Sequence, residues 1–206
     1  MRHLVPAELP LDTFAGQCWL GVAPFHMSAI HGRALPAFPG ISAFPELNVR
    51  TYVTVGGKGG VYFFSLDAAS RLAVWAAKKF FKLPYFYAGM QVQDNAGTIA
   101  YTCARKSGEA SFEASYKPCA PIRYRGPGTL DHWISERYCL YTVHDRKVYR
   151  AEIHHPQWPL QDAQAEIGVN TVAAAAGVNL PETPPLLHFA KRLQVLIWPL
   201  RLVVAD

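Results

Sequence analysis

The chain has 206 residues, of which 50% are hydrophobic, 13% aromatic and only 17% charged. This composition supplies enough apolar surface to offset the entropy of ordering the chain, which excludes intrinsic disorder and predicts one folded domain over residues 1–206. The formal net charge is +5. Because the basic residues form no long stripe and accompany no nucleic-acid motif, a nucleic-acid partner is not expected.

Neither end of the sequence is typical of a membrane segment. Glu8 and Asp12 interrupt the N-terminal region where a signal peptide would be continuously apolar, and basic residues break the apolar run at 186–204. The four cysteines lie far apart without a CxxC pair, which is typical of free thiols in a reducing compartment. We therefore expect a cytoplasmic protein with no membrane partner, no disulfide framework and no structural zinc site.

Alternation of side chains with a period of two is the main structural signal. Residues 46–55 alternate in this way, and residues 61–66 follow after four glycines grouped around Lys58, which predicts a β-hairpin. Seven further strands are predicted, at residues 18–25, 85–92, 98–105, 110–116, 137–144, 148–154 and 187–197. So many short strands indicate a sandwich or a barrel. Its core should include Leu47, Val49, Val53, Phe63 and Phe64.

Two helices are predicted among these strands. The first covers residues 68–81, with Asp67 as its N-cap, and should pack on the sheet through a mainly apolar stripe. That stripe consists of Leu72, Trp75, Ala76, Lys79 and Phe80. The second covers residues 162–176, which are rich in alanine, and ends at Gly177, a favourable residue after a helix C-terminus. The predicted class is α+β, with strands predominant.

Five blocks of sequence give the chain a family resemblance. They are ELNVRTYV (46–53), GVYFFSLDA (60–68), KLPYFYAGM (82–90), SERYCLYT (135–142) and HHPQWPLQ (154–161). In their order and spacing they resemble the YqjF-like family of uncharacterised bacterial proteins, which is in turn distantly similar to acetoacetate decarboxylase. The resemblance implies a cone-shaped β-barrel with a few flanking helices and a pocket inside it. Similarity of fold does not carry over the reaction.

The lysines of acetoacetate decarboxylase are not matched in this sequence. That enzyme forms a Schiff base on a lysine activated by a cationic neighbour, and its lysine pair follows a Gly-Phe-Pro segment. The most similar segment here is Leu83-Pro84-Tyr85-Phe86, so tyrosine and phenylalanine stand at the lysine positions. Three lysines precede this proline, and we expect them to be exposed, namely Lys78, Lys79 and Lys82. The resemblance therefore predicts that no Schiff base forms.

Glu46 and Arg50 are the main candidates for a functional site. Residues four apart on a strand share a face, and Asn48 and Tyr52 lie on the same face. Arg50 could hold a substrate carboxylate through two parallel hydrogen bonds, and Glu46 could act as a catalytic proton donor or acceptor. Alternation alone favours a solvated polar face, where such a pair contributes little. The family resemblance, by contrast, implies a strand glutamate that lines the pocket, so both alternatives are open at this point.

Tyrosines are further candidates for substrate binding. Tyr52, Tyr85 and Tyr87 would each offer apolar area and one hydroxyl group to a ligand, although tyrosine is also common in ordinary strand packing. In another predicted strand, Glu136 and Arg137 point to opposite faces. The sequence does not decide which of these two lies inside.

No motif indicates a metal ion or a cofactor. His154 and His155 are adjacent and would point to opposite faces of a strand, while His26 and His31 lack the spacing of a helical zinc site. His155 is expected to bond to backbone in a structured turn that begins at Pro156. The sequence contains no GxSxG, no phosphate-binding glycine loop and no GxGxxG after a strand. We expect no cofactor.

Two hypotheses about function follow from these residues. The first is a lysine-independent enzyme acting on a small organic acid or carbonyl compound, with Arg50 anchoring the ligand, Glu46 moving a proton and Tyr85 or Tyr87 shaping the pocket. The second is a non-catalytic binding protein on the same fold. Both predict an internal pocket for a small-molecule ligand, and Arg50 favours an anionic one.

Overall fold

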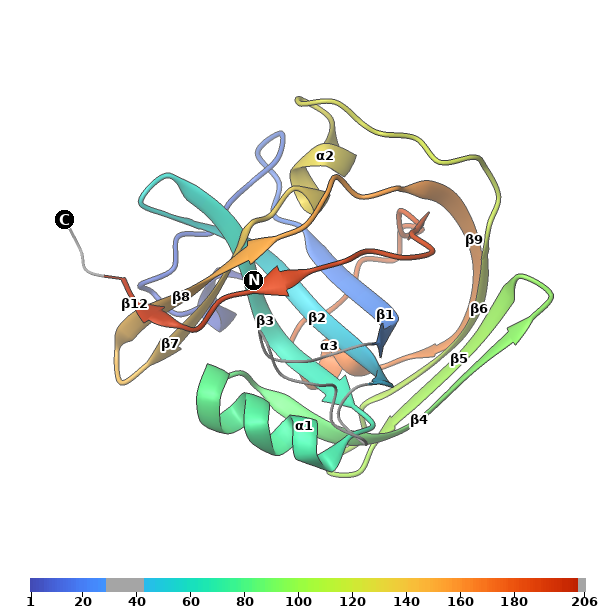
Figure 1. Cartoon of the computed structure of the whole chain (residues 1–206), viewed down its shortest axis with the longest axis horizontal. Coiled ribbons are helices and arrows are strands. Elements are labelled where there is room, and N and C mark those ends of the chain that lie inside the picture. The colour runs from blue at the N-terminus through green and yellow to red at the C-terminus, as the bar shows by residue number, and fades with distance from the viewer. Residues whose placement is uncertain (29–42, 204–206) are drawn as a thin grey trace.

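The computed structural model describes residues 1–28 and 43–203, which form one large, strongly curved sheet with a few short helices (Figure 1). Its strands are β1 (Leu20–Ser28), β2 (Ala43–Val55), β3 (Lys58–Ala68), β4 (Tyr85–Asn95), β5 (Thr98–Arg105), β6 (Ser111–Pro118), β7 (Cys139–His144), β8 (Lys147–His154), β9 (Gln161–Asn170), β10 (His188–Phe189), β11 (Leu196–Ile197) and β12 (Arg201–Leu202). The helices are α1 (Arg71–Ala76), which continues into a π-helical segment (Ala77–Phe81), α2 (Leu130–Ser135), α3 (Val172–Ala175) and a 3-10 turn (Arg2–Leu4). In this described part of the chain, no helix combines the length and the apolar character needed to cross a membrane.

Strand β3 is the centre of the sheet because it pairs with three other strands. One of its edges carries the antiparallel β2, which in turn pairs with β1. The other edge is divided between two parallel partners, with β4 beside residues 66–68 and β7 beside residues 61 and 62. From β4 one arm of the sheet continues through β5, β6 and β9 to β10, and from β7 the other arm continues through β8 to β11 and β12.

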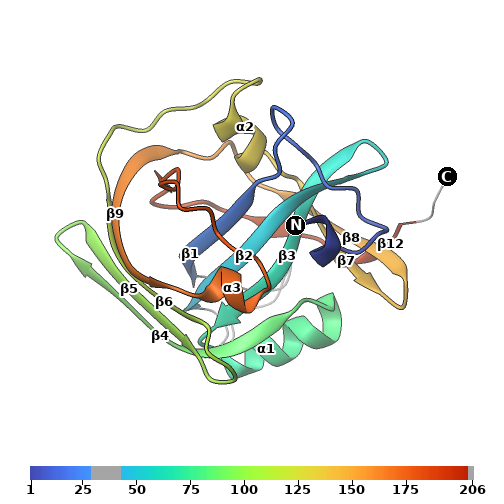
Figure 2. The same cartoon turned by 180° about the vertical axis from the view of Figure 1, so that it is seen from behind.

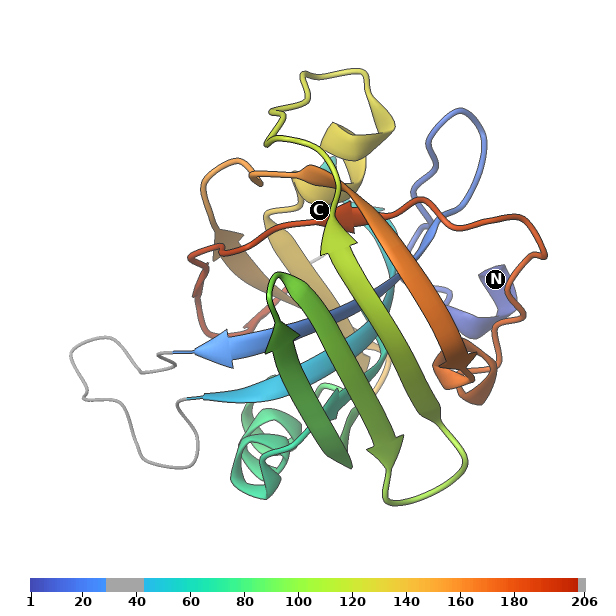
Figure 3. The same ribbon diagram turned by 90° about the vertical axis from the view of Figure 1, so that its right-hand side faces the viewer.

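The two arms curve without closing into a barrel. Figure 3 shows β4, β5, β6 and β9 as one wall, with β1 and β2 crossing behind it at a steep angle. Among the described strands, β1 pairs only with β2, and the arms end at β10 and β11. The closed cone-shaped barrel expected from the resemblance is therefore an open curved sheet. It stays open because the described strands at its ends, β1, β10 and β11, do not pair with one another.

The β2–β3 hairpin confirms the prediction from alternation and glycine placement. Val55 pairs with Lys58, so Gly56 and Gly57 form a two-residue turn, and their positive φ values of 55° and 72° are those that a tight turn between twisted strands requires. Farther along β3, a Cβ on Gly60 would lie only 2.6 Å from the backbone oxygen of Cys139. Glycine at this position therefore permits the close approach of β7.

Both faces of this hairpin are buried, which the alternating pattern did not indicate. On one face, Leu47 and Val49 pack against residues of β5 and β6. On the other face, Phe63 packs against β7, β8 and α2. Val53 contacts the N-terminal segment, and the partly buried Phe64 packs against the clusters that contain Leu47 and Val53. The predicted contribution of these five side chains to the core is confirmed.

The helix predicted at residues 162–176 is wrong over most of its length. The segment forms β9, which pairs antiparallel with β6, and only α3 is helical. Alanine has a high helix propensity, but apolar and polar residues alternate from 163 to 167, and pairing with β6 outweighs the propensity. Gly177 does follow α3 with a positive φ of 79°, as predicted for a helix C-terminus.

The first predicted helix starts later than expected and buries a different face. The side chain of Ser70, and not Asp67, caps α1 by accepting a hydrogen bond from the amide of Ala73 (3.2 Å). The helix lies beside β3 and β4 (Figure 2) and buries the face that carries Ala73. The expected packing stripe is instead largely exposed, at Leu72, Trp75 and Phe80. Strand β3 extends through Asp67 to residue 68, which delays the start of the helix.

The long strand predicted at residues 187–197 is two short strands. β10 pairs with β9, whereas β11 pairs with β8. Figure 1 shows the red C-terminal chain crossing in front of the sheet to reach β8. Since β8 and β9 belong to different arms, one straight strand cannot pair with both.

Candidate functional site

The polar residues of β2 lie on one face, and two of them stand opposite small residues of β1. Arg50 pairs with Gly21 and Asn48 pairs with Ala23, in a ladder without a register shift. Alternate residues of β2 therefore keep a common face, and the neighbouring strand offers little bulk there. A Cβ placed on Gly21 would lie 3.4 Å from both Arg50 Nε and the Tyr52 hydroxyl oxygen. The Arg50 side chain thus lies across Gly21, on the side of Tyr52.

Glu46 is a buried carboxyl group with one hydrogen-bond donor. It is only 3% exposed, and the hydroxyl group of Tyr85 donates a hydrogen bond to its Oε2 (2.9 Å). Burial raises the pKa of Glu46 to about 7; the Tyr85 hydrogen bond opposes this shift, and the negative charge of Asp67 adds to it. Burial and the adjacent Glu46 raise the pKa of Tyr85 well above its usual value. Glu46 can therefore exchange a proton close to neutral pH, while Tyr85 remains a donor.

Asn48 and Arg50 carry buried polar atoms without partners. Asn48 is 3% exposed, and its Oδ1 accepts no hydrogen bond. Arg50 Nε is likewise buried and unpartnered, and no described acidic residue forms an ion pair with this guanidinium. Buried polar groups in native proteins are nearly always satisfied by protein, water or a ligand. This face of β2 can therefore accept a further hydrogen bond at Asn48 Oδ1 and donate a further one from Arg50 Nε.

The structure places the two other candidate tyrosines in packing contacts. The ring of Tyr52 lies 4.8 Å from that of Trp133, between their centroids, and the guanidinium carbon of Arg137 lies 5.2 Å from its centre. Tyr87 packs beside α1, with the guanidinium carbon of Arg71 4.5 Å from its ring centre. Of the three tyrosines, Tyr85 is the one that donates to Glu46.

Tyr85 and Phe86 stand at the positions expected for the decarboxylase lysines, and both side chains have partners within the protein. Tyr85 bonds to Glu46, and the ring of Phe86 lies 3.9 Å from the guanidinium carbon of Arg105. Lys78 and Lys79 are exposed on the π-helical segment, as expected. Lys82 was expected to be exposed as well, but it is partly buried, because its ammonium group lies over the ring of Tyr149 at 5.7 Å from the ring centre. No described lysine forms an ion pair or a hydrogen bond with Glu46.

A buried ion pair on the opposite face of the β2–β3 hairpin was missed by the sequence reasoning. Asp67 is fully buried and accepts two hydrogen bonds from Arg105, to Oδ1 at 2.7 Å and to Oδ2 at 2.8 Å. The Arg105 side chain is itself only 6% exposed. Asp67 has the residue type of a helix N-cap and precedes the helical pattern, but it also ends an apolar alternating run, where a charged side chain is buried only if it is paired.

Arg137, and not Glu136, is the buried member of its pair. Its Nη1 donates to Asp12 (2.6 Å), and its guanidinium carbon lies 4.0 Å from the centre of the Trp133 ring. The ring nitrogens of His155 contact the backbone oxygens of Pro156 (2.9 Å) and Arg137 (3.3 Å), so the predicted bonding of this imidazole to backbone is confirmed, although residues 155–160 form an irregular segment and not a turn.

The structure of residues 1–28 and 43–203 shows no arrangement of side chains suited to binding a metal ion. No group of three or more His, Cys, Asp or Glu side chains in these ranges could hold an ion. His26 lies in β1, and His31 falls outside the described residues.

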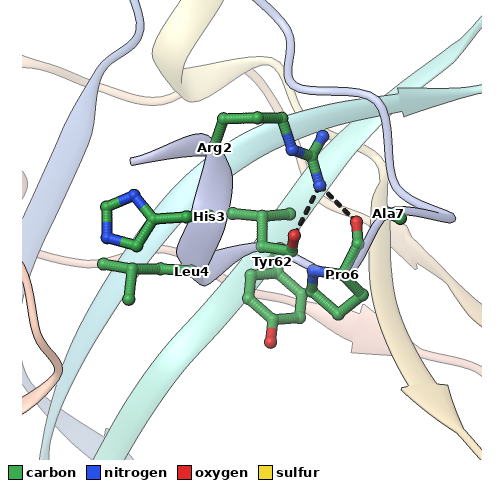
Figure 4. Close-up of a pocket in the computed structure, with 7 residues that line it drawn as sticks. Arg2, His3, Leu4, Pro6, Ala7 and Tyr62 are labelled. Carbon is green, nitrogen blue, oxygen red and sulfur yellow. Dashed lines mark hydrogen bonds between the residues drawn. The ribbon is translucent and has the colours of Figure 1, made fainter.

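Two surface hollows lie away from Glu46 and Arg50. The larger, of about 500 Å³, is lined by the N-terminal residues 2–7 and Tyr62 (Figure 4). There Arg2 donates to the backbone oxygens of Leu9 (2.6 Å) and Val5 (2.5 Å), so this guanidinium stabilises the N-terminal turn. The smaller, of about 200 Å³, lies on β5, β6 and neighbouring residues.

Solved structures with a similar fold come from acetoacetate decarboxylases and related enzymes. The enzyme from Legionella pneumophila superposes with a TM-score of 0.67 at 10% identity, over 98% of this chain and 79% of that one. An acetoacetate decarboxylase-like enzyme from Sphingomonas wittichii gives a TM-score of 0.56 at 13% identity, over 89% and 74% of the two chains. At such low identity the likeness concerns the fold alone.

Sequence comparison identifies a more similar relative and a matching family. The uncharacterized protein YqjF of Bacillus subtilis is 52% identical over 202 residues, which cover 98% of this chain and 84% of that protein. Residues 1–194 match the DUF2071 family, described as an uncharacterized conserved protein. The YqjF-like resemblance and the similarity to the acetoacetate decarboxylase fold are both confirmed, and this chain belongs to the DUF2071 family.

Proposed function

We propose that the polar face of β2 binds a small organic acid or carbonyl compound, and that Glu46 exchanges a proton with it without a lysine nucleophile. The observation that carries this proposal is the Glu46 carboxyl group, which is 3% exposed, bonded to Tyr85 and has a pKa of about 7. A general acid or base works best when its pKa lies near the operating pH. Perturbed carboxyl groups of this kind are concentrated at functional sites.

The other residues of the face have complementary roles in this proposal. Arg50 binds the carboxylate of the ligand, since its Nε lacks a partner and a guanidinium matches a carboxylate through two parallel hydrogen bonds. Tyr85 fixes Glu46 by bonding to Oε2, which leaves Oε1 for the ligand. Asp67 raises the pKa of Glu46 through its negative charge.

The alternative is a binding protein that performs no chemistry. It is favoured by the contacts of Tyr85 and Phe86, which fill the expected lysine positions with a phenol and an apolar ring. In this case the Glu46–Tyr85 pair is a fixed polar lining that recognises a ligand. Turnover of a panel of small oxo and hydroxy acids, followed by NMR with wild type and Glu46→Gln, distinguishes the two functions.

Binding itself is tested by calorimetric titration of the protein with sodium butyrate. Arg50→Lys should weaken butyrate binding about tenfold, because an ammonium group lacks the planar fork of arginine. Arg146→Lys is the matched control, since the Arg146 side chain is 94% exposed, and it should bind like wild type. Equal affinity in all three proteins would contradict the proposal.

Treatment with acetoacetate and borohydride should leave every lysine unmodified. No described lysine forms an ion pair or a hydrogen bond with Glu46, and the positions expected for the decarboxylase lysines carry Tyr85 and Phe86. Intact-mass and peptide mass spectrometry measure the outcome. A stable reduced adduct on one lysine would show that Schiff-base chemistry is retained.

A further inference from the structure

Asn48 stands between Glu46 and Arg50 on β2 and is a buried amide without any hydrogen-bond partner for its side chain. A carbonyl oxygen in this state costs about 1–3 kcal/mol relative to one that is bonded. Hydrophobic residues of similar size would avoid this cost, so packing alone does not account for an amide here. The unpaired Oδ1 indicates that the face receives a hydrogen-bond donor from outside the protein.

The chemistry of the two neighbouring groups restricts what that donor is. Arg50 Nε is an unpartnered donor and selects an acceptor such as a carboxylate, whereas Asn48 Oδ1 is an unpartnered acceptor and selects a donor. Alternate residues of a strand lie roughly 7 Å apart. A ligand that satisfies both therefore carries a carboxylate at one end and a hydrogen-bond donor a few bonds farther along.

We infer that the face binds a small hydroxy acid whose carboxylate meets Arg50 and whose hydroxyl group, on the third carbon, donates to Asn48 Oδ1. This inference rests on the proposed function and names the substrate class of the same site. An oxo acid has no proton to donate at that carbon and leaves Oδ1 unsatisfied. Asn48 is thus a specificity-determining residue that distinguishes hydroxy acids from unsubstituted acids of the same length.

The experiment titrates the full chain calorimetrically with butyrate and with each enantiomer of 3-hydroxybutyrate, which differ from butyrate by one hydroxyl group. Wild type should bind one enantiomer about tenfold more tightly than butyrate, because one buried hydrogen bond is gained. In Asn48→Leu this preference, measured as the ratio of the two affinities within the same variant, should disappear. Asn170→Leu is the matched control, since Asn170 Oδ1 is also buried and unpartnered but lies on β9.

The outcomes separate this inference from the proposed function. Equal binding of butyrate and both hydroxy acids by wild type, or an unchanged preference in Asn48→Leu, would overturn the role of Asn48 while leaving Arg50 as an anion site. Failure of wild type to bind any of the acids would overturn both. If Asn48→Leu does not fold, the wild-type ratio still decides, and Asn48→Ser provides a second variant that should reduce the preference.

Discussion

Replacing Asp67 with alanine should lower the free energy of unfolding by about 3–5 kcal/mol, because it leaves the Arg105 guanidinium buried without its counter-charge. Asp67 is fully buried and holds Arg105 through two hydrogen bonds of 2.7 and 2.8 Å. Urea denaturation followed by fluorescence measures the loss. The same change should lower the pKa of Glu46, since the charge of Asp67 raises it.

Asp162→Ala is the control for this measurement. Asp162 pairs with Arg125 at 3.3 Å, but its side chain is 44% exposed, so the ion pair is screened by solvent. Exposed pairs contribute about 1 kcal/mol or less. A loss for Asp67→Ala that is no larger than the loss for Asp162→Ala would show that Arg105 finds water or another partner when Asp67 is removed.

Glu46→Gln should stabilise the folded protein at pH 8 by on the order of 3 kcal/mol and have little effect at pH 4. The pKa of Glu46 is raised from 4.5 to about 7, so the folded state binds this proton more tightly than the unfolded state does. The corresponding stability is fully present below pH 4.5 and is lost as the pH rises through 7. Glutamine stays neutral at every pH and can still accept the hydrogen bond from Tyr85.

The measurement is the difference in unfolding free energy between wild type and Glu46→Gln at several pH values, because other groups titrate in both proteins and cancel. Tyr85→Phe is a useful companion, since it removes the donor to Oε2 and should raise the pKa of Glu46 further. A difference that does not change between pH 4 and pH 8 would show that Glu46 is solvated, with an ordinary pKa.

The central hairpin and the shared face of the candidate residues could be predicted because they depend on local rules. Gly56 and Gly57 supply the positive φ values of the turn, and the two-residue period fixes which side chains of β2 lie together. The same rules do not say what covers a face. The burial of Glu46 depends on residues distant in sequence, such as Tyr85, and periodicity contains no information about them.

The errors arose where local propensity competed with long-range pairing. The alanines of β9 favour a helix, yet the free edge of β6 recruits this segment as a strand. Asp67 has the residue type of a helix cap, yet its carboxylate accepts a hydrogen bond from Arg105 of β5. The side chain of Ser70 caps the helix instead. In both cases the deciding partner lies tens of residues away, beyond the range of any window of sequence.

The division of one edge of β3 between β4 and β7 has a consequence for how the molecule folds. β4 follows β3 after one short helical connection, so the pairing of Leu66 with Tyr85 closes a short loop. The pairing of Val61 with Leu140 must wait for a much longer loop, whose closure costs more chain entropy. The arm that begins at β4 is therefore able to form first. The hydrogen bond from Tyr85 to Glu46 belongs to this early arm, whereas the contact of Tyr52 with Trp133 must wait for the later part of the chain, so the polar face of β2 is assembled in two stages.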